Sequence, residues 1–169
     1  MSKKPIASRP YMPEYGILDE KSGKGLLPWG WAQQRLSKTP YYWVSTVRPD
    51  GRPHAMVVWG IWVKDVLYFS TGRKSRKAKN LAANPRCAIS VLAGDDAVIV
   101  EGTASEIRAG SRIKPLSKVY KEKYGMALDI NLGPVYAVNP SVVFGFIGAS
   151  HEDNVTGDFQ GASTRWRFS

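Results

Sequence analysis

Short runs of apolar and β-branched residues, separated by turn residues, fill most of the chain from residue 41 onward. Runs of this kind predict β-strands. Arg48-Pro49-Asp50-Gly51 joins the first two as a hairpin, because proline presets the first central angle of a turn and glycine accepts a positive φ. The second run, Pro53–Val63, is almost wholly apolar and predicts a strand covered on both faces. The predicted strands are Tyr41–Val47, Pro53–Val63, Val66–Thr71, Arg86–Leu92, Ala97–Ile107, Val135–Val138, Ser141–Ile147 and Thr164–Phe168.

Three segments between these runs have helical periodicity. Pro28–Lys38 begins with a proline suited to a first helical turn. Ser75–Ala83 has Ser75 as a good N-cap, and Asn84-Pro85 ends it. Ser111–Tyr124 predicts a basic amphipathic helix that ends at a glycine. Its expected apolar stripe consists of Ile113, Leu116, Val119 and Tyr120.

Many short strands with a few small helices favour a mainly β fold over a doubly wound parallel sheet. We therefore predict a small closed or split β-barrel of six to eight mostly antiparallel strands, Greek-key-like, with short flanking helices. Residues 1–28 are rich in proline, glycine and charge, and they predict an N-terminal arm. Residues 29–169 are then a single domain, with a polar loop over residues 148–163.

The net charge of the chain indicates the kind of ligand that it binds. The chain of 169 residues has a formal net charge of +10, which implies an anionic partner: nucleic acid, a membrane surface or a phosphorylated small molecule. One cysteine excludes an internal disulfide, and two histidines are too few for a zinc site of the usual spacing. We expect no metal. No apolar run is long enough to span a bilayer, so we expect a soluble, cytoplasmic protein.

The positive charge is concentrated at the predicted start of the second helix. Five of the seven residues from Arg73 to Lys79 are lysine or arginine. A helix start already disfavours cations, because the macrodipole is positive there. Such crowding predicts an anion-binding site in the stretch Tyr68–Leu81.

The order of several short motifs resembles the pyridoxamine 5′-phosphate oxidase-like superfamily of split-barrel flavoproteins. The resemblance covers about residues 30–148. It rests on Tyr42–His54 with its Arg-Pro-Asp-Gly turn, on Leu67–Thr71, on Ser75–Leu81 and on Asn84-Pro85. The closing Thr164–Phe168 is similar to the ending of a bacterial branch whose members use FMN or the deazaflavin F420.

The resemblance implies a set of cofactor-binding positions. In the oxidase, a pair at a strand end and an Arg-Lys pair at the next helix hold the ribityl phosphate of FMN, and the matching residues here are Ser70, Thr71, Arg76 and Lys77, with Ser75 before them. The family lays its isoalloxazine ring along the strand that here runs from Met56 to Trp62, with Val58 and Trp59 as the expected contacts. The full set of expected cofactor-binding residues is Met56, Val57, Val58, Trp59, Ser70, Thr71, Ser75, Arg76, Lys77 and Trp166.

Two departures argue against pyridoxamine phosphate as the substrate. Met56 replaces a phosphate-binding arginine of the oxidase, and Ala97 replaces a glutamine that bonds the cofactor, and neither side chain can make those hydrogen bonds. The Arg and His cluster that receives pyridoxal phosphate also has no counterpart, since the ionisable residues of the segment 150–163 are His151 and acids. These losses are shared with the F420-using branch. F420 and FMN remain nearly equal alternatives, with a slight lean to F420.

The resemblance implies an oxidoreductase that passes a hydride between this cofactor and a small organic substrate, with no catalytic acid or nucleophile required of the protein. Trp59, Trp62, Tyr68 and Trp166 are candidate aromatic walls, and Arg165 and Arg167 are candidates for an acidic group. The family also implies a homodimer, whose second chain completes the site with Trp166 or the loop around His151. Two alternatives remain: a cofactor-binding protein for storage or sensing without turnover, and a basic β-barrel that binds single-stranded nucleic acid.

Overall fold

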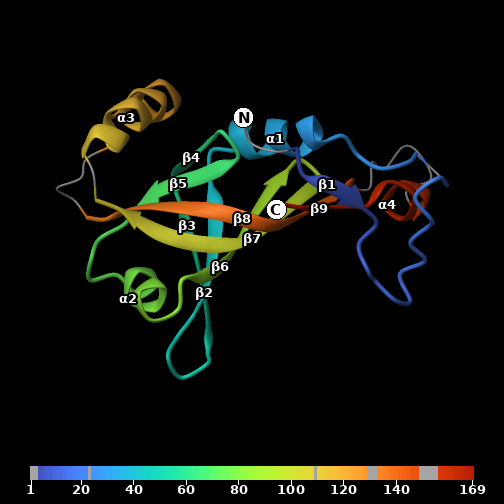
Figure 1. Ribbon diagram of the computed structural model, residues 1–169, viewed down its shortest axis with the longest axis horizontal. Coiled ribbons are helices and arrows are strands. Elements are labelled where there is room, and N and C mark those ends of the chain that lie inside the picture. Colours follow the sequence, from blue (N-terminus) through green and yellow to red (C-terminus); the bar gives the residue numbers. More distant parts are fainter. Residues whose placement is uncertain (1–3, 23, 109, 129–132, 149–155) are drawn as a thin grey trace. The chain divides into compact units, whose positions relative to one another are not determined.

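The computed structural model of the chain describes residues 4–22, 24–108, 110–128, 133–148 and 156–169 (Figure 1). It is mainly antiparallel β-sheet with a few short helices, as predicted. The strands are β1 (Ile6–Ser8), β2 (Tyr42–Val47), β3 (Pro53–Val58), β4 (Gly60–Val63), β5 (Val66–Ser70), β6 (Arg86–Ala93), β7 (Asp96–Ile107), β8 (Val135–Phe146) and β9 (Thr164–Arg167). The helices are α1 (Trp29–Lys38), α2 (Arg76–Ala83), α3 (Gly110–Tyr124) and α4 (Thr156–Ala162).

The strands hydrogen-bond in the order β1-β9-β8-β7-β6-β2-β3, and β5 pairs with both β4 and β8. The sheet is not closed, so of the two predicted forms, a closed and a split barrel, the structure has the split one. The described residues form nine strands instead of the expected six to eight: the arm adds β1 and the run Pro53–Val63 makes two strands, while the runs Val135–Val138 and Ser141–Ile147 join into one.

The chain divides into two compact units, and strands β6, β7 and β8 have residues in both. Unit 1 consists of Met1–Thr39, Ser90–Val100 and Ser141–Ser169. Unit 2 consists of Pro40–Ile89 and Glu101–Pro140. The residues of the N-terminal arm group with unit 1, while the anion-binding stretch lies entirely within unit 2.

The core of unit 1 is built on tryptophan. Trp166 of β9 is almost fully buried and meets Trp29 of α1 edge-on, with ring centroids 5.4 Å apart. Gly145 makes room for this packing, since a Cβ there would lie 2.8 Å from the Trp166 ring. The predicted arm is tied down in two ways: β1 pairs with β9, and the Arg9 guanidinium donates to backbone carbonyls, among them those of Ser22, Gly161 and Ser163.

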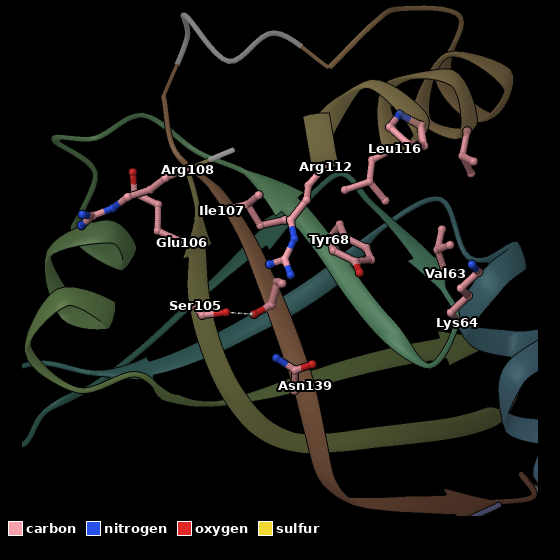
Figure 2. A pocket seen from close by; sticks show the side chains of 13 residues that line it. Val63, Lys64, Tyr68, Ser105, Glu106, Ile107, Arg108, Arg112, Leu116 and Asn139 are labelled. Atoms are coloured by element: carbon pink, nitrogen blue, oxygen red, sulfur yellow. Dashed lines mark hydrogen bonds between the residues drawn. The ribbon is translucent and has the colours of Figure 1, made fainter. Parts of the chain in front are cut away.

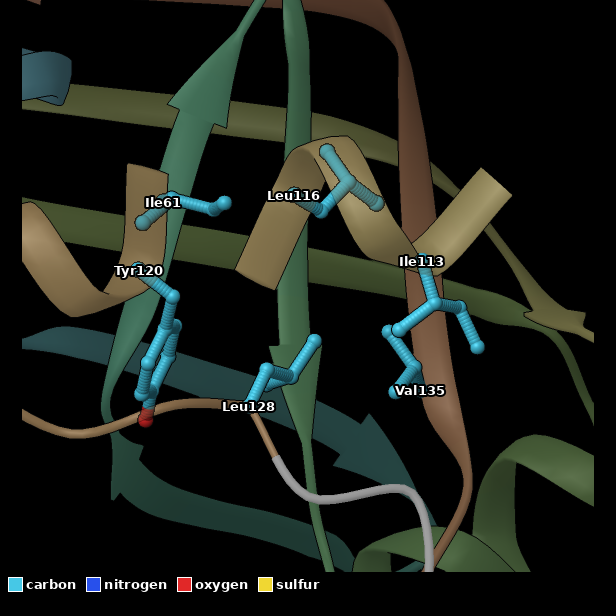
Figure 3. Packing of buried hydrophobic residues seen from close by; sticks show 6 residues of the cluster. All are labelled: Ile61, Ile113, Leu116, Tyr120, Leu128 and Val135. Atoms are coloured by element: carbon cyan, nitrogen blue, oxygen red, sulfur yellow. The ribbon is translucent and has the colours of Figure 1, made fainter. Parts of the chain in front are cut away.

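Unit 2 combines the β2–β3 hairpin with β4, β5 and the first part of β8, and helix α3 packs against these strands. Figure 3 shows Ile113, Leu116 and Tyr120 pointing from α3 toward Ile61, Leu128 and Val135. All six side chains are buried. The apolar stripe predicted for α3 is therefore confirmed except at Val119, which is 36% exposed.

The expectation of one doubly covered strand over Pro53–Val63 is wrong. The run breaks at Trp59 into β3 and β4, and four of the six β3 residues are exposed. Strand β3 stands at the end of the hydrogen-bonded order. Hydrophobicity along a run does not reveal whether the strand is central or at an edge, so the pattern was compatible with both.

Two further predictions are corrected at the C-terminal side. The runs Val135–Val138 and Ser141–Ile147 form one strand, β8, which continues through Asn139-Pro140. Its first part pairs with β5 and its last part with β9, so Pro140 falls between these partners, and Gly102 leaves space for the backbone there. In the loop expected over residues 148–163, the structure has helix α4.

Candidate functional site

The start of helix α2 is organised around Ser75, which is the N-cap as predicted. Its Oγ accepts a hydrogen bond from the backbone N–H of Ala78 at 3.2 Å. By helix geometry, the N–H groups of the first turn that precede Ala78, those of Arg76 and Lys77, have no acceptor within the helix. Backbone N–H groups in this position bind anions, and the helix dipole favours negative charge there.

Three side chains form a polar cluster beside this helix start. The Lys77 ammonium donates to Thr71 Oγ1 at 2.9 Å, and Thr71 Oγ1 lies 3.1 Å from Ser75 Oγ. Thr71 follows the end of β5, where its N–H donates to the carbonyl of Pro134. The strand end and the helix start are thus held together by the residues predicted to bind a phosphate.

Lys77 carries a positive charge in a partly buried place. Burial lowers the pKa of its ammonium, because removal of water disfavours the charged form. In the part of the chain that the structure describes, Lys77 has a hydroxyl partner and no carboxylate partner. A ligand anion at this position would restore the lost stabilisation of the charge.

Lys77 and Ser70 open onto a cleft of about 320 Å³ that lies within unit 2. The cleft brings together five of the predicted site residues: Val57, Val58, Trp59, Ser70 and Lys77. Helix α3 and the segment after it supply the rest of the lining, which is Tyr120, Met126, Ala127 and Leu128. One end of the cleft is therefore cationic and hydroxylic, and the other is apolar and aromatic.

An aromatic stack closes the apolar end. Trp59 lies parallel to Tyr124 with ring centroids 5.3 Å apart, and Tyr124 in turn contacts Tyr120 at 4.7 Å. The Tyr124 hydroxyl is fixed by the backbone of Gly60, to whose carbonyl it donates at 2.7 Å and from whose N–H it accepts at 3.0 Å. These bonds anchor the end of α3 to the point where β3 and β4 separate.

Lys123 lies next to Tyr124 of this stack. Its ammonium donates to the Tyr42 hydroxyl at 3.1 Å and to the Gly60 carbonyl at 3.0 Å, and it also faces the rings of Tyr42 and Tyr124. Burial lowers the pKa of Lys123 to about 8. Burial likewise raises the pKa of Tyr42, so the tyrosine stays neutral beside the lysine.

The structure separates the other predicted residues from the cleft lining. Thr71 and Ser75 support Lys77, whereas Arg76 and Met56 are exposed nearby in sequence without lining the cleft. Trp62 is partly buried on β4. In unit 1, Trp166 is buried, Arg165 donates to the Ser8 hydroxyl, and Arg167 is exposed. His151 lies outside the described residues. The roles predicted for these residues stay predictions.

Sequence reasoning missed the contribution of α3. Tyr120 was expected only as packing, and Tyr124, Met126 and Leu128 were not considered as part of a site. The available signal was the pair Tyr120 and Tyr124, which are four residues apart and so share one helix face. Arg73, one of the cations counted in the basic stretch, is paired: its guanidinium lies 2.9 Å from the Glu106 carboxylate.

The geometry suits a ligand with a phosphate at one end and a flat ring system at the other. The phosphate end is built from Lys77, the hydroxyls of Ser70 and Thr71 and the start of α2. The ring end has Trp59 and Tyr120, and the edge strand β3 offers backbone donors and acceptors along its unpaired side. The residues present therefore fit a flavin-type cofactor.

Within the described ranges, no group of three or more His, Cys, Asp or Glu side chains is placed to hold a metal ion. None of the helices in these ranges has the length and apolar character needed to cross a membrane.

Comparison with known proteins agrees with this geometry. A family model described as pyridoxamine 5′-phosphate oxidase matches residues 31–145. The comparison with curated proteins found no match. Among solved structures, one titled F420 Reductase is 28% identical, with a TM-score of 0.55 over 66% of this chain and 94% of that chain.

Two more distant structures share the fold. General Stress Protein 26 from Bacillus anthracis is 21% identical, with a TM-score of 0.55 over 66% of this chain and 88% of that chain. The heme storage protein HutZ from Vibrio cholerae is 15% identical, with a TM-score of 0.54 over 64% of this chain and 84% of that chain. Because the family model spans more than half of the sequence, the chain belongs to the pyridoxamine 5′-phosphate oxidase-like family of split-barrel proteins.

Proposed function

We propose that this protein is an oxidoreductase that uses a flavin-type cofactor, F420 or FMN, to transfer a hydride to or from a small organic substrate. The observation that carries the proposal is the cleft of about 320 Å³ in unit 2, which joins Lys77 and Ser70 to Val57, Val58 and Trp59. The cleft has anion-binding groups at one end and the edge strand β3 at the other, and its volume is sufficient for a small-molecule ligand.

The residues at the start of α2 hold the phosphate. Lys77 supplies the partly buried charge, Ser70, Thr71 and Ser75 supply hydroxyls, and Arg76 supplies a second, exposed cation. Charge-assisted hydrogen bonds of this kind are about twice as strong as neutral ones. This end of the site therefore fixes the position of the cofactor along the cleft.

The residues at the other end orient the ring. The unpaired edge of β3, from Met56 to Val58, offers N–H and C=O groups to the polar rim of the ring, and Trp59 and Tyr120 provide apolar contact. The bound flavin or deazaflavin supplies the hydride chemistry. Packing of Trp59 on Tyr124, and of Tyr124 on the Gly60 backbone, keeps this wall rigid and excludes water from one side.

The choice between the two cofactors leans to F420. The structure titled F420 Reductase matches this chain at 28% identity over most of its own length. At Met56, where the oxidase binds the phosphate with arginine, the chain has an apolar side chain that is half exposed. Together with Ala97 and the missing Arg and His cluster of the oxidase, this difference argues against pyridoxamine phosphate as the substrate.

Reconstitution of the purified protein with each cofactor tests the proposal. We expect F420 to raise the melting temperature more than FMN, because a ligand that binds only the native state stabilises it. The bound cofactor should then be reduced or reoxidised by members of a panel of small conjugated substrates. Failure of both cofactors to bind at micromolar concentrations would contradict the proposal, whereas tight binding without turnover would support the alternative of a storage or sensing protein.

We further propose that the protein is a homodimer whose second copy completes this site. The outer face of the β2–β3 hairpin is apolar and exposed: Trp43 pairs with Val57, and Val47 pairs with Pro53. Exposed apolar patches of this kind mark interaction surfaces. Val57 also lines the cleft, so a chain that covers this face would reach the site.

A further inference from the structure

Unit 2 contains a second and larger pocket, of about 770 Å³, that shares no described lining residue with the cofactor cleft. Figure 2 shows it between helix α3 and strands β5, β7 and β8. Its volume lies in the range of small-molecule sites. The function proposed above makes no use of it.

The walls of this pocket are largely apolar and are held by the core. Leu116 and Val119 of α3 face Tyr68 of β5 and Ile107 of β7 across it. Leu116 is itself part of the buried cluster that attaches α3 to the strands, and Tyr68 is fixed by its pairing with Ala137 of β8. The space is therefore preformed, because its two sides cannot approach without disturbing the core.

The rim of the pocket is positively charged. Lys64, Arg108 and Arg112 line it, and the Arg112 side chain reaches from the start of α3 toward β8 (Figure 2). Glu106 is the one carboxylate among the described lining residues, and its Oε1 already accepts from the Arg73 guanidinium at 2.9 Å. The described lining thus carries three cations, of which Arg112 reaches into the middle of the pocket, and one carboxylate that a fourth cation neutralises (Figure 2).

Polar atoms for a bound acid group are also present. The Asn139 side chain is exposed on the pocket side of β8, and the Ser105 hydroxyl makes only a long, 3.5 Å bond to the Ala137 carbonyl (Figure 2). Both lie on the strand side of the pocket, opposite the α3 wall. An anion near Arg112 would have donors on both sides.

We propose that this pocket is a second ligand site, which binds a small organic anion with one acid group on an aromatic or branched apolar body. Arg112 binds the acid group, and Leu116, Val119 and Tyr68 contact the body. The site is independent of the cofactor cleft, so its occupancy does not require the cofactor. A polar polyanion is a poor match, because most of the lining is apolar.

Binding of 8-anilino-1-naphthalenesulfonate, which joins one sulfonate to an aromatic body, tests the site by fluorescence titration. We expect one saturable site per chain with a Kd of about 10–100 µM. Arg112→Ala should weaken binding about 5- to 10-fold, the effect of losing a charge-assisted contact at a partly exposed position. The matched control Lys114→Ala removes an exposed cation from the same helix outside the pocket, and it should change the Kd less than about twofold.

The uncharged analogue N-phenyl-1-naphthylamine separates the two parts of the recognition. Its binding should be insensitive to Arg112→Ala, whereas Val119→Glu should weaken both probes, and the melting temperature of each variant checks that it is folded. Equal effects of Arg112→Ala and Lys114→Ala, or displacement of the probe by F420 or FMN, would overturn the proposal. Failure of cofactor binding would contradict the proposed function and leave the probe results unaffected, so the two are tested separately.

Discussion

At the scale of single residues, the cations of the anion-binding stretch have different roles. Lys77 lines the cleft and is partly buried, Arg76 is exposed beside it, and Lys79 is exposed on the same helix. The pKa of Asp50 is lowered, mainly by a side-chain hydrogen bond from Arg52. The positive charge of Arg76 adds a smaller coulombic contribution, so Arg76 lies near Asp50. We therefore expect the cations closer to the cleft to contribute more to cofactor binding.

We predict that Lys77→Ala weakens cofactor binding most, Arg76→Ala about tenfold, and Lys79→Ala less than about twofold. The reason is that only the first two can contact a phosphate held between Thr71 and the start of α2. Isothermal titration with the preferred cofactor measures all three. Equal losses at Arg76 and Lys79 would indicate a diffuse basic patch instead of a defined site.

Because Lys123 is partly buried, its protonation makes the stability of the protein depend on pH. Its pKa of about 8 in the folded protein lies below the value of about 10.5 expected when unfolded. Below pH 8 the folded state therefore bears the cost of a partly desolvated charge, and this cost disappears as the pH rises toward 10.5. The unfolded state binds more protons over this interval, so stability rises with pH.

We predict that the free energy of unfolding of the wild type rises relative to Lys123→Met between pH 8 and 10.5. After allowance for the exposed part of the side chain, the relative gain should be about 1–2 kcal/mol. Urea unfolding at several pH values measures it. A difference between the two proteins that is independent of pH would show that Lys123 titrates normally.

At the scale of the element, helix α2 depends on one residue for both its stability and its anion site. Ser75 caps the helix through the N–H of Ala78, and its Oγ also lies 3.1 Å from Thr71 Oγ1. Ser75→Ala removes both contacts. Ser75→Asp keeps a capping oxygen but adds a negative charge where the phosphate would lie.

We predict that Ser75→Ala lowers stability by about 1 kcal/mol and weakens cofactor binding. Ser75→Asp should keep the stability and abolish the binding, since like charges repel. Thermal unfolding and cofactor titration of both variants separate the two effects. Cofactor binding by Ser75→Asp at the wild-type level would place the phosphate away from the start of α2.

At the scale of the whole molecule, the proposed homodimer depends on the exposed apolar face of β2 and β3. Trp43 and Val47 are 50% and 41% exposed, and Val57 opposite Trp43 is 42% exposed. An exposed apolar face that ends in the edge strand β3 is a hazard for a monomer, because apolar patches and unpaired strand edges associate. Coverage by a second copy would remove the hazard.

We predict a dimer by light scattering, and a monomer for Val47→Glu, which places a charge on this face at its turn end. If the second chain completes the site, the monomeric variant should also bind the cofactor more weakly than the wild type. Leu92→Glu is the matched control, because Leu92 is 70% exposed and belongs to unit 1. A monomeric wild-type protein would contradict the assembly and the shared site.

Most of the elements and half of the site could be predicted from the sequence. The β2–β3 turn, strands β5 to β7, the α2 cap and the Lys77 region follow from local rules, because turns, caps and periodicity depend on neighbouring residues. The tertiary structure alone decided that β3 is an exposed edge, that β8 runs through Pro140, and that α3 supplies Tyr120 to the cleft. These features depend on contacts between residues far apart in the chain, which periodicity cannot specify.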